Sequence, residues 1–207
     1  MSRLLIIGAG GHGQVAADLA ELLGWEEIGL LDDNPAAVDT PWPILGPADP
    51  DALARHAAEA AHFFIGIGDN RARETKMAEL QGLGLGCETL LHPHAHASGH
   101  AALGEGTLLA MGAMVGVMAN LGNGVIINSG ATVDHDCKIG DFVHISPGAH
   151  IAGGVQIGER TWVGIGASIL ERVRIGTDVM IGAGAAVISD LPDGARVGGV
   201  PAHPLDG

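Results

Sequence analysis

The chain has 207 residues, 47% of them hydrophobic, which is enough to bury the core of one domain or of two small ones. Its formal net charge is -14 and it has no cluster of Lys and Arg, which excludes the basic surface of a nucleic-acid-binding protein. The apolar runs are too short to span a bilayer and no signal-peptide pattern follows Met1, so we expect a cytoplasmic protein without membrane contact.

Glycine and aliphatic residues dominate the composition. The sequence contains 34 glycines, only 3% aromatic residues and no tyrosine. Gly does not recur at every third position, which excludes collagen, and the abundance of Ile, Leu and Val excludes disorder. A regular, Gly-rich β-solenoid remains. Cys87 and Cys137 are far apart and lack metal-ligand spacing, so we expect two free thiols.

Residues 1–90 alternate short aliphatic strands with helical stretches, which is typical of an α/β domain with a small parallel sheet. We expect strands at about residues 4–7, 28–31, 63–67 and 87–90. Helices are expected at about residues 12–23, 51–60 and 70–82. The pattern predicts a truncated doubly wound, Rossmann-like domain that is too short for a complete dinucleotide fold.

Gly-Ala-Gly-Gly-His-Gly at residues 8–13 follows the first strand and fits the G-x-G-x-x-G motif in its strand-to-helix context. The helix N-terminus offers N–H groups and a positive dipole end, which favours a pyrophosphate ligand over a simple tight turn. Asp32 and Asp33 follow the second strand, where carboxylates accept hydrogen bonds from a ribose or base. An NAD enzyme is the first interpretation, but His12 is not a standard residue of that fingerprint, so we expect a different nucleotide. Arg71 begins a helix, where its guanidinium can contact solvent as well as a phosphate, so we leave it outside the site.

A period of six runs without interruption from Leu103 to Val187. The first position of each hexad is always Leu, Ile or Val, and fifteen such matches in a row arise by chance on the order of once in a billion. The fifth position is usually small or β-branched and includes Cys137, which we expect to be buried. Three hexads close one triangular coil of a left-handed parallel β-helix, and about five coils stack. Leu91 and Ala97 are in register to extend the run backwards.

Asp134, His135 and Asp136 interrupt the apolar pattern of the hexads. His135 is at a third position, which we expect to be accessible to solvent. A carboxylate beside a histidine fixes its tautomer and stabilises the imidazolium, as a general base requires. An exposed turn histidine is the alternative. His144 and His150 lie at sixth positions, and a zinc ion shared by histidines of adjacent subunits is a further alternative, although we expect no metal.

The Gly-rich motif, Leu-Asp-Asp at residues 31–33 and the hexads with Asp-His-Asp together resemble the bacterial nucleotide-sugar acetyltransferases of the NeuD/PglD-like, sialic acid O-acetyltransferase-related family. Gly-Val-Pro-Ala-His-Pro at residues 199–204 is similar to the Gly-Val-Pro-Ala-Lys-Pro ending of hexapeptide acyltransferases, with His203 replacing lysine. The likeness covers essentially the whole chain. It implies a nucleotide-sugar-binding domain at residues 1–90 and an acetyl-CoA-binding β-helix at residues 91–207. It also implies a homotrimer, with active sites between neighbouring solenoids.

The same resemblance implies individual roles. The family's catalytic His-Glu pair matches His135 and Asp136, whose carboxylate is one methylene closer to the backbone. His135 would accept a proton as a sugar amine attacks the acetyl thioester directly, while a backbone N–H near Gly153 stabilises the oxyanion. The substrate would be held by Gly8, Gly11, His12, Asp32, Asp33 and Asn128, and acetyl-CoA by His144, Gly153 and Pro201.

The sequence leaves several hypotheses of the function open. The resemblance implies an acceptor that is a 4-amino sugar linked to UDP, GDP or dTDP, with UDP favoured, in a pathway of glycan biosynthesis. An O-acetyltransferase acting on a sugar hydroxyl keeps the same fold. Three hypotheses come from other functional classes: a non-catalytic scaffold, a zinc-dependent enzyme similar to carbonic anhydrase, and a dehydrogenase.

Overall fold

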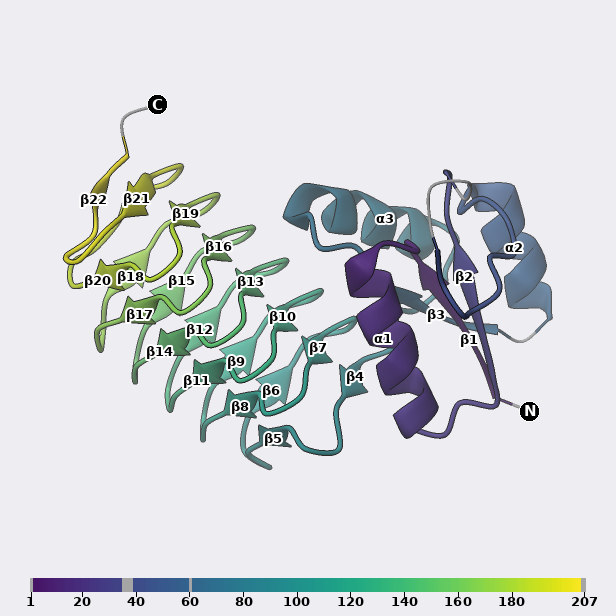
Figure 1. Ribbon diagram of the computed structural model, residues 1–207, viewed down its shortest axis with the longest axis horizontal. Helices are drawn as coiled ribbons and strands as arrows, with labels where there is room; N and C mark the ends of the chain where they lie inside the picture. Colours follow the sequence, from purple (N-terminus) through teal and green to yellow (C-terminus); the bar gives the residue numbers. More distant parts are fainter. Residues whose placement is uncertain (1, 35–38, 60, 206–207) are drawn as a thin grey trace. The chain divides into compact units, whose positions relative to one another are not determined.

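The computed structural model describes residues 2–34, 39–59 and 61–205 (Figure 1). Contacts within the chain divide it into two compact units, Met1–Leu90 and Leu91–Gly207. None of the helices formed by the described residues has the length and apolar character needed to cross a membrane.

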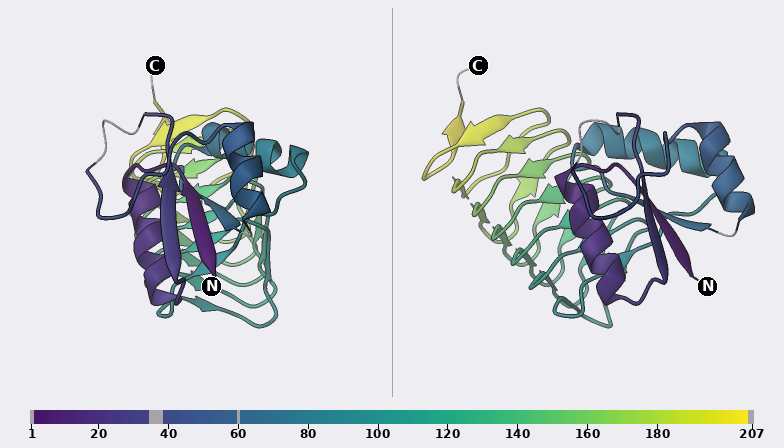
Figure 2. Two further views of the ribbon diagram at one scale, coloured as in Figure 1. Left: turned by 90° about the vertical axis from the view of Figure 1, so that its right-hand side faces the viewer. Right: turned by 45° about the vertical axis from the view of Figure 1, so that its right-hand side comes forward.

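The first unit is a small α/β layer structure. Its three strands form a parallel sheet in the order β2-β1-β3. Helix α1 packs against β1 and β2 on one face, and α2 and α3 pack against β3 on the other (Figure 2). The elements are β1 (Arg3–Ile7), α1 (Gly11–Leu22), β2 (Glu27–Leu31), α2 (Pro50–Ala58), β3 (Ala61–Ile65) and α3 (Asn70–Gly82). Because the strands are covered on both faces, they consist of continuous apolar runs.

The edges of this sheet differ from the expectation. The predicted strand at residues 87–90 was wrong. Glu88 N–H donates to the Phe63 carbonyl (2.7 Å), but residues 87–89 form no strand, and Leu90 pairs within face 1 of the β-helix as part of β4. The opposite edge is extended by residues 43–46, where Leu30 N–H donates to the Pro43 carbonyl (2.9 Å). Strand β3 also ends earlier than expected, at Ile65. The expected end of the second helix, residue 60, lies outside the described residues.

The second unit is the predicted left-handed parallel β-helix (Figure 1). Strands of two residues stack along three faces, and paired residues are 18 apart in sequence, so three hexads close one coil. Face 1 contains β4 (Leu90–Leu91), β7 (Leu108–Leu109), β10 (Ile126–Ile127), β13 (His144–Ile145), β16 (Trp162–Val163), β19 (Met180–Ile181), β21 (Arg196–Gly198) and β22 (His203–Pro204). Face 2 contains β5 (His96–Ala97), β8 (Met114–Val115), β11 (Thr132–Val133), β14 (His150–Ile151), β17 (Ser168–Ile169) and β20 (Ala186–Val187). Face 3 contains β6 (Ala102–Leu103), β9 (Asn120–Leu121), β12 (Lys138–Ile139), β15 (Gln156–Ile157) and β18 (Arg174–Ile175).

The hexad positions explain this geometry. First-position aliphatics point inward and form one continuous core together with the small fifth-position residues, including Cys137, which is fully buried as predicted. The fourth position adopts positive φ, usually as glycine, and turns the chain from one face to the next. After Val187 the hexad pattern ends, and β22 folds back antiparallel to β21. This hairpin ends the stack, as terminal units of repeat proteins do.

Candidate functional site

The Gly-rich turn joins β1 to α1 in the first unit. Gly8 has φ +100°, and a Cβ there would lie 2.9 Å from the Ile67 side chain. A Cβ on Gly13 would overlap the Gly8 carbonyl, so the helix packs directly against the turn. By contrast, a Cβ on Gly11 would meet no atom within 4 Å. The first and last of these glycines therefore permit close packing, and Gly11 faces open space.

Helix α1 begins without a side-chain cap. Its N-cap residue is Gly10, and its first turn contains no acidic residue. In contrast, the side chains of Asp49 and Asp69 cap α2 and α3 by accepting the N–H groups of Ala52 and Ala72 (2.8 Å each). The uncapped N–H groups and the positive dipole end of α1 are suited to a phosphate.

Asp32 and Asp33 organise the loops around this helix end. The Asp32 carboxylate accepts the backbone N–H groups of Ala9 and Asn34 (2.8 Å each). Asp33 accepts the N–H of Ala48 (3.0 Å). Each carboxylate oxygen has two acceptor sites, so these bonds leave capacity for a ribose or base. Asp32 thus fixes the Gly-rich turn and Asp33 fixes the segment before α2, in addition to their predicted contact with a nucleotide.

His12 lies in the first turn of α1 and is largely buried. Burial, followed by the nearby charge of Arg73, lowers the pKa of His12 to about 4, so the imidazole is neutral at pH 7. Arg73 itself is 1% exposed. Arg71, which we left outside the predicted site, is exposed, and the sequence pattern gave no sign of the buried Arg73.

In the β-helix, Asp134, His135 and Asp136 form the turn between β11 on face 2 and β12 on face 3. His135 Nδ1 and Asp136 Oδ2 are 2.7 Å apart, and the two side chains are 56% and 65% exposed. The shorter aspartate therefore reaches the imidazole. Asp136 has φ 59°, a conformation that Asp tolerates better than most residues. The Asp134 side chain accepts the His135 backbone N–H (2.7 Å).

The electrostatics of this turn suit a base. The hydrogen bond to Asp136, followed by the charge of Asp134, raises the pKa of His135, while Arg172 has a weaker opposing effect. A carboxylate only accepts hydrogen bonds, so Nδ1 carries the proton and Nε2 presents its lone pair. The predicted exposure of His135 is confirmed.

Gly153 is stacked on His135 one coil further along the β-helix. A Cβ on Gly153 would lie 2.5 Å from His135 Nε2 and 2.6 Å from its Cε1. The next residue, Gly154, donates its N–H to the His135 carbonyl (2.9 Å). The imidazole thus occupies the space that a side chain at position 153 would take.

Asn128, His144 and Trp162 meet on face 1. Asn128 Nδ2 and His144 Nε2 are 3.2 Å apart, and the rings of His144 and Trp162 stack with centroids 4.7 Å apart. Trp162 Nε1–H donates to Ser146 Oγ (2.9 Å). These residues line a largely apolar hollow of about 510 Å³ that continues to Met180. Sequence reasoning missed Ser146 and Trp162, although the 18-residue coil places Trp162 directly after His144.

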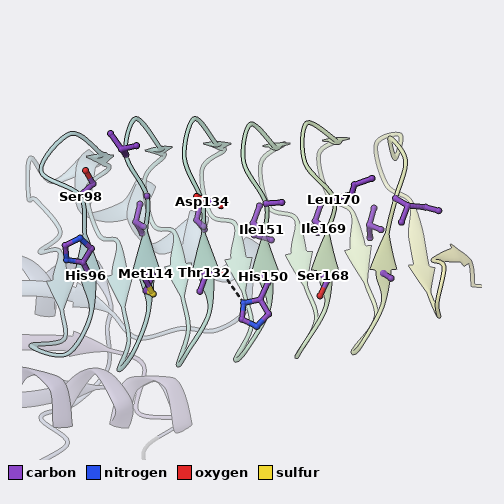
Figure 3. A pocket seen from close by; sticks show the side chains of 18 residues that line it. His96, Ser98, Met114, Thr132, Asp134, His150, Ile151, Ser168, Ile169 and Leu170 are labelled. Carbon is purple, nitrogen blue, oxygen red and sulfur yellow. Dashed lines mark hydrogen bonds between the residues drawn. The ribbon is translucent and has the colours of Figure 1, made fainter.

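Face 2 carries a larger groove, of about 900 Å³ (Figure 3). Met114, Thr132, His150 and Ser168 follow one another along its floor, and Thr132 Oγ1 lies 2.9 Å from His150 Nδ1. Met114 and Leu170 are about half exposed, at 52% and 47%. The groove therefore presents apolar side chains to solvent.

The predicted site residues form separate groups in one chain. His135, Asp136 and Gly153 are together at the turn between faces 2 and 3. Asn128 and His144 are together on face 1, and Pro201 is exposed in the C-terminal hairpin. The described residues contain no group of three His, Cys, Asp or Glu side chains suited to a metal. His144 and His150 lie on different faces of the β-helix, and His144 is buried.

Comparisons with known proteins agree with both units. The family model described as PglD N-terminal domain matches residues 3–80, and that of the bacterial transferase hexapeptide matches residues 118–153 and 154–189. The acetyltransferase domain of PglB from Neisseria gonorrhoeae FA1090, solved with acetyl coenzyme A, is 41% identical, with 98% of each chain covered and a TM-score of 0.93. The chain belongs to the PglD-like family of nucleotide-sugar acetyltransferases.

Two further similar proteins are informative. PerB from Caulobacter crescentus, solved with CoA and GDP-perosamine, is 35% identical over 100% of this chain and 98% of its own, with a TM-score of 0.93. UDP-N-acetylbacillosamine N-acetyltransferase from Bacillus subtilis (strain 168) is 37% identical over 113 residues. That match covers 53% of this chain, and it spans about half (51%) of the length of the curated relative.

Proposed function

We propose that this chain transfers the acetyl group of acetyl-CoA to the 4-amino group of a nucleotide-linked amino sugar, with His135 as general base. The observation that carries this proposal is the pairing of His135 Nδ1 with Asp136 at 2.7 Å, which leaves Nε2 as the basic atom. A relative named UDP-N-acetylbacillosamine N-acetyltransferase and the structure of PerB with CoA and GDP-perosamine support the substrate class, and UDP is our first candidate for the nucleotide.

The reaction needs no acyl-enzyme. The amine nitrogen attacks the thioester carbon, and the new C–N bond replaces the C–S bond. His135 Nε2 takes the amine proton and returns it to the departing CoA thiolate. The backbone N–H of Gly153, one coil away, is our candidate donor to the developing oxyanion. Asn128 would contact the sugar, while His144 and Pro201 would contact the cofactor.

The remaining substrate contacts are assigned to the first unit. The uncapped N-terminus of α1 and the open space at Gly11 fit a diphosphate, with Gly8 setting the turn and His12 beside it. Asp32 and Asp33 would bind the ribose or base. Neutral His12 can still donate one hydrogen bond to a phosphate oxygen.

We further propose that the enzyme is a homotrimer in which neighbouring copies complete each site. In one chain the group around His135, at the turn between faces 2 and 3, is separate from the group around His144 on face 1. The exposed apolar groove of face 2 also favours burial against another copy. Light scattering gives the mass of the assembly, and a monomer with full activity would contradict this proposal.

The function is tested by CoA release from acetyl-CoA with a panel of UDP-, GDP- and dTDP-linked 4-amino sugars. Product mass must show one added acetyl group. We expect turnover of one amino sugar and a loss of at least a hundredfold in kcat/KM for His135→Ala, the lower end of general-base contributions. If no amino sugar of the panel is acetylated but a sugar hydroxyl is, this proposal is wrong and the enzyme is an O-acetyltransferase.

A further inference from the structure

Arg73 is the largest of the fully buried side chains in the described part of the molecule. Burial lowers the pKa of Arg73 to about 10, which still leaves it charged at neutral pH. Burying a cation is unfavourable unless hydrogen bonds compensate for lost water. An aliphatic side chain would fill the same space, so the charge at this position requires its own explanation.

The guanidinium bonds to the loop that precedes its own helix and to the first residue of that helix. Its Nη1 donates to the carbonyls of Ile67 and Gly68 (2.9 Å each), and its Nη2 donates to Asn70 Oδ1 (2.8 Å). This loop connects β3 to α3. The planar group satisfies three acceptors that lie in different directions, which a lysine ammonium on a flexible stem does less well.

The same loop forms one wall of the Gly-rich turn. A Cβ on Gly66 would lie 2.6 Å from the Cα of Gly13, and one on Gly8 would lie 3.1 Å from the Gly66 carbonyl oxygen. A Cβ on Gly68 would lie 4.0 Å from the Cβ of His12. Because these backbones pack closely, we expect a displacement of the loop to disturb the start of α1.

We propose that Arg73 is a positioning residue for the nucleotide sugar, which holds the loop Ile67–Asn70 against the Gly-rich turn and adds a fixed positive charge behind the diphosphate site. This inference rests on the proposed function. The positive charge of Arg73 acts on His12 and lowers the pKa of its imidazole. The nearby Asp69 carboxylate raises the pKa of Arg73. The same carboxylate also caps α3, because its Oδ1 accepts the Ala72 N–H.

The test compares Arg73→Met and Arg73→Lys with Arg71→Met, a matched control at an exposed position of the same helix. Calorimetry measures the affinity for UDP and GDP and for the two nucleosides without phosphate. NMR titration of the His12 imidazole reports the local charge. Wild-type protein that binds neither diphosphate would overturn the nucleotide site of the proposed function, independently of the variants.

For Arg73→Met we expect the diphosphate to bind on the order of tenfold more weakly, with a higher pKa at His12. Nucleoside and acetyl-CoA affinities should change less than twofold. Arg73→Lys should recover part of the loss because it keeps the charge. Unchanged diphosphate affinity in Arg73→Met overturns the inference. An equal loss of affinity for diphosphate and nucleoside, without a shift in the pKa of His12, overturns it as well. If Arg73→Met does not fold, Arg73→Lys serves as the test. A diphosphate affinity of Arg73→Lys equal to that of the wild type then overturns the inference.

Discussion

The imidazole of His135 lies over Gly153, with its Nε2 atom 2.5 Å from the place where a Cβ would stand. Gly153 is not among the glycines with positive φ, so its backbone accepts an alanine. The consequence of Gly153→Ala therefore falls on the imidazole, which must turn away from the position that its contact with Asp136 defines.

We expect Gly153→Ala to lower kcat/KM by a factor on the order of ten to a hundred without unfolding the β-helix. The control is Gly99→Ala, because a Cβ there meets no atom within 4 Å and its φ is not positive either. Steady-state kinetics and thermal unfolding of both variants check the prediction. Full activity of Gly153→Ala would show that the imidazole does not need this position.

The pH dependence of the reaction should follow the charges around His135. A base works only when deprotonated, so kcat/KM falls as the pH drops through the pKa of His135. Since the bond to Asp136 raises this pKa, Asp136→Asn should move the acidic limb to lower pH. At high pH the variant should remain slower by about tenfold or more, because the ring loses its orienting partner.

Arg172 offers the opposite change. Its charge lowers the pKa of His135, so Arg172→Gln should move the acidic limb to higher pH. Complete pH profiles of the two variants and the wild type decide the matter. Shifts in the same direction for both variants would exclude His135 as the titrating group.

The stack of His144 on Trp162 provides a signal for cofactor binding. We expect acetyl-CoA to change the fluorescence of Trp162, whose ring lines the hollow of face 1. Trp162→Phe should remove the signal, whereas the double variant Trp25→Phe, Trp42→Phe should keep it. His144→Ala should weaken binding by about three- to tenfold, the range expected for one lost ring contact. A signal confined to the other two tryptophans would contradict this assignment of the cofactor site.

The β-helix could be predicted in detail because its period acts at two levels. The six-residue repeat assigns each side chain to the core or to the surface, as Cys137 shows. The 18-residue coil assigns vertical neighbours, and it places Gly153 beside His135 and Trp162 beside His144. The predictions for the core rest on the first level alone. The second level would have identified Trp162 as part of the candidate site.

Other features could not be predicted because they depend on packing between distant segments. Leu90 continues an apolar run and reads as a fourth strand of the sheet, yet it forms the first strand of the β-helix. Arg73 belongs to a polar helix whose pattern does not distinguish it from the exposed Arg71. Its burial follows from the carbonyls of the neighbouring loop, which local periodicity does not report.

His12 should make the stability of the protein depend on pH. Its pKa is about 4 in the folded chain and about 6.5 when unfolded. Between these values the unfolded state binds a proton that the folded state excludes, so the free energy of unfolding falls as the pH drops below 6.5. The loss from this residue is about 1.4 kcal/mol at pH 5.5 and approaches about 3 kcal/mol near pH 4.

Urea unfolding of the wild type and His12→Asn at pH 7.5 and 5.5 checks this prediction. Asn has no group that titrates at this position, so the stability of the variant should fall less between the two pH values than that of the wild type. Comparing the two differences removes the constant cost of the substitution and the contributions of the other histidines, which titrate in both proteins. Equal losses in the two proteins would mean that His12 accepts a proton in the folded state. The imidazole would then be open to charge at acidic pH, and phosphate binding beside it should strengthen as the pH falls.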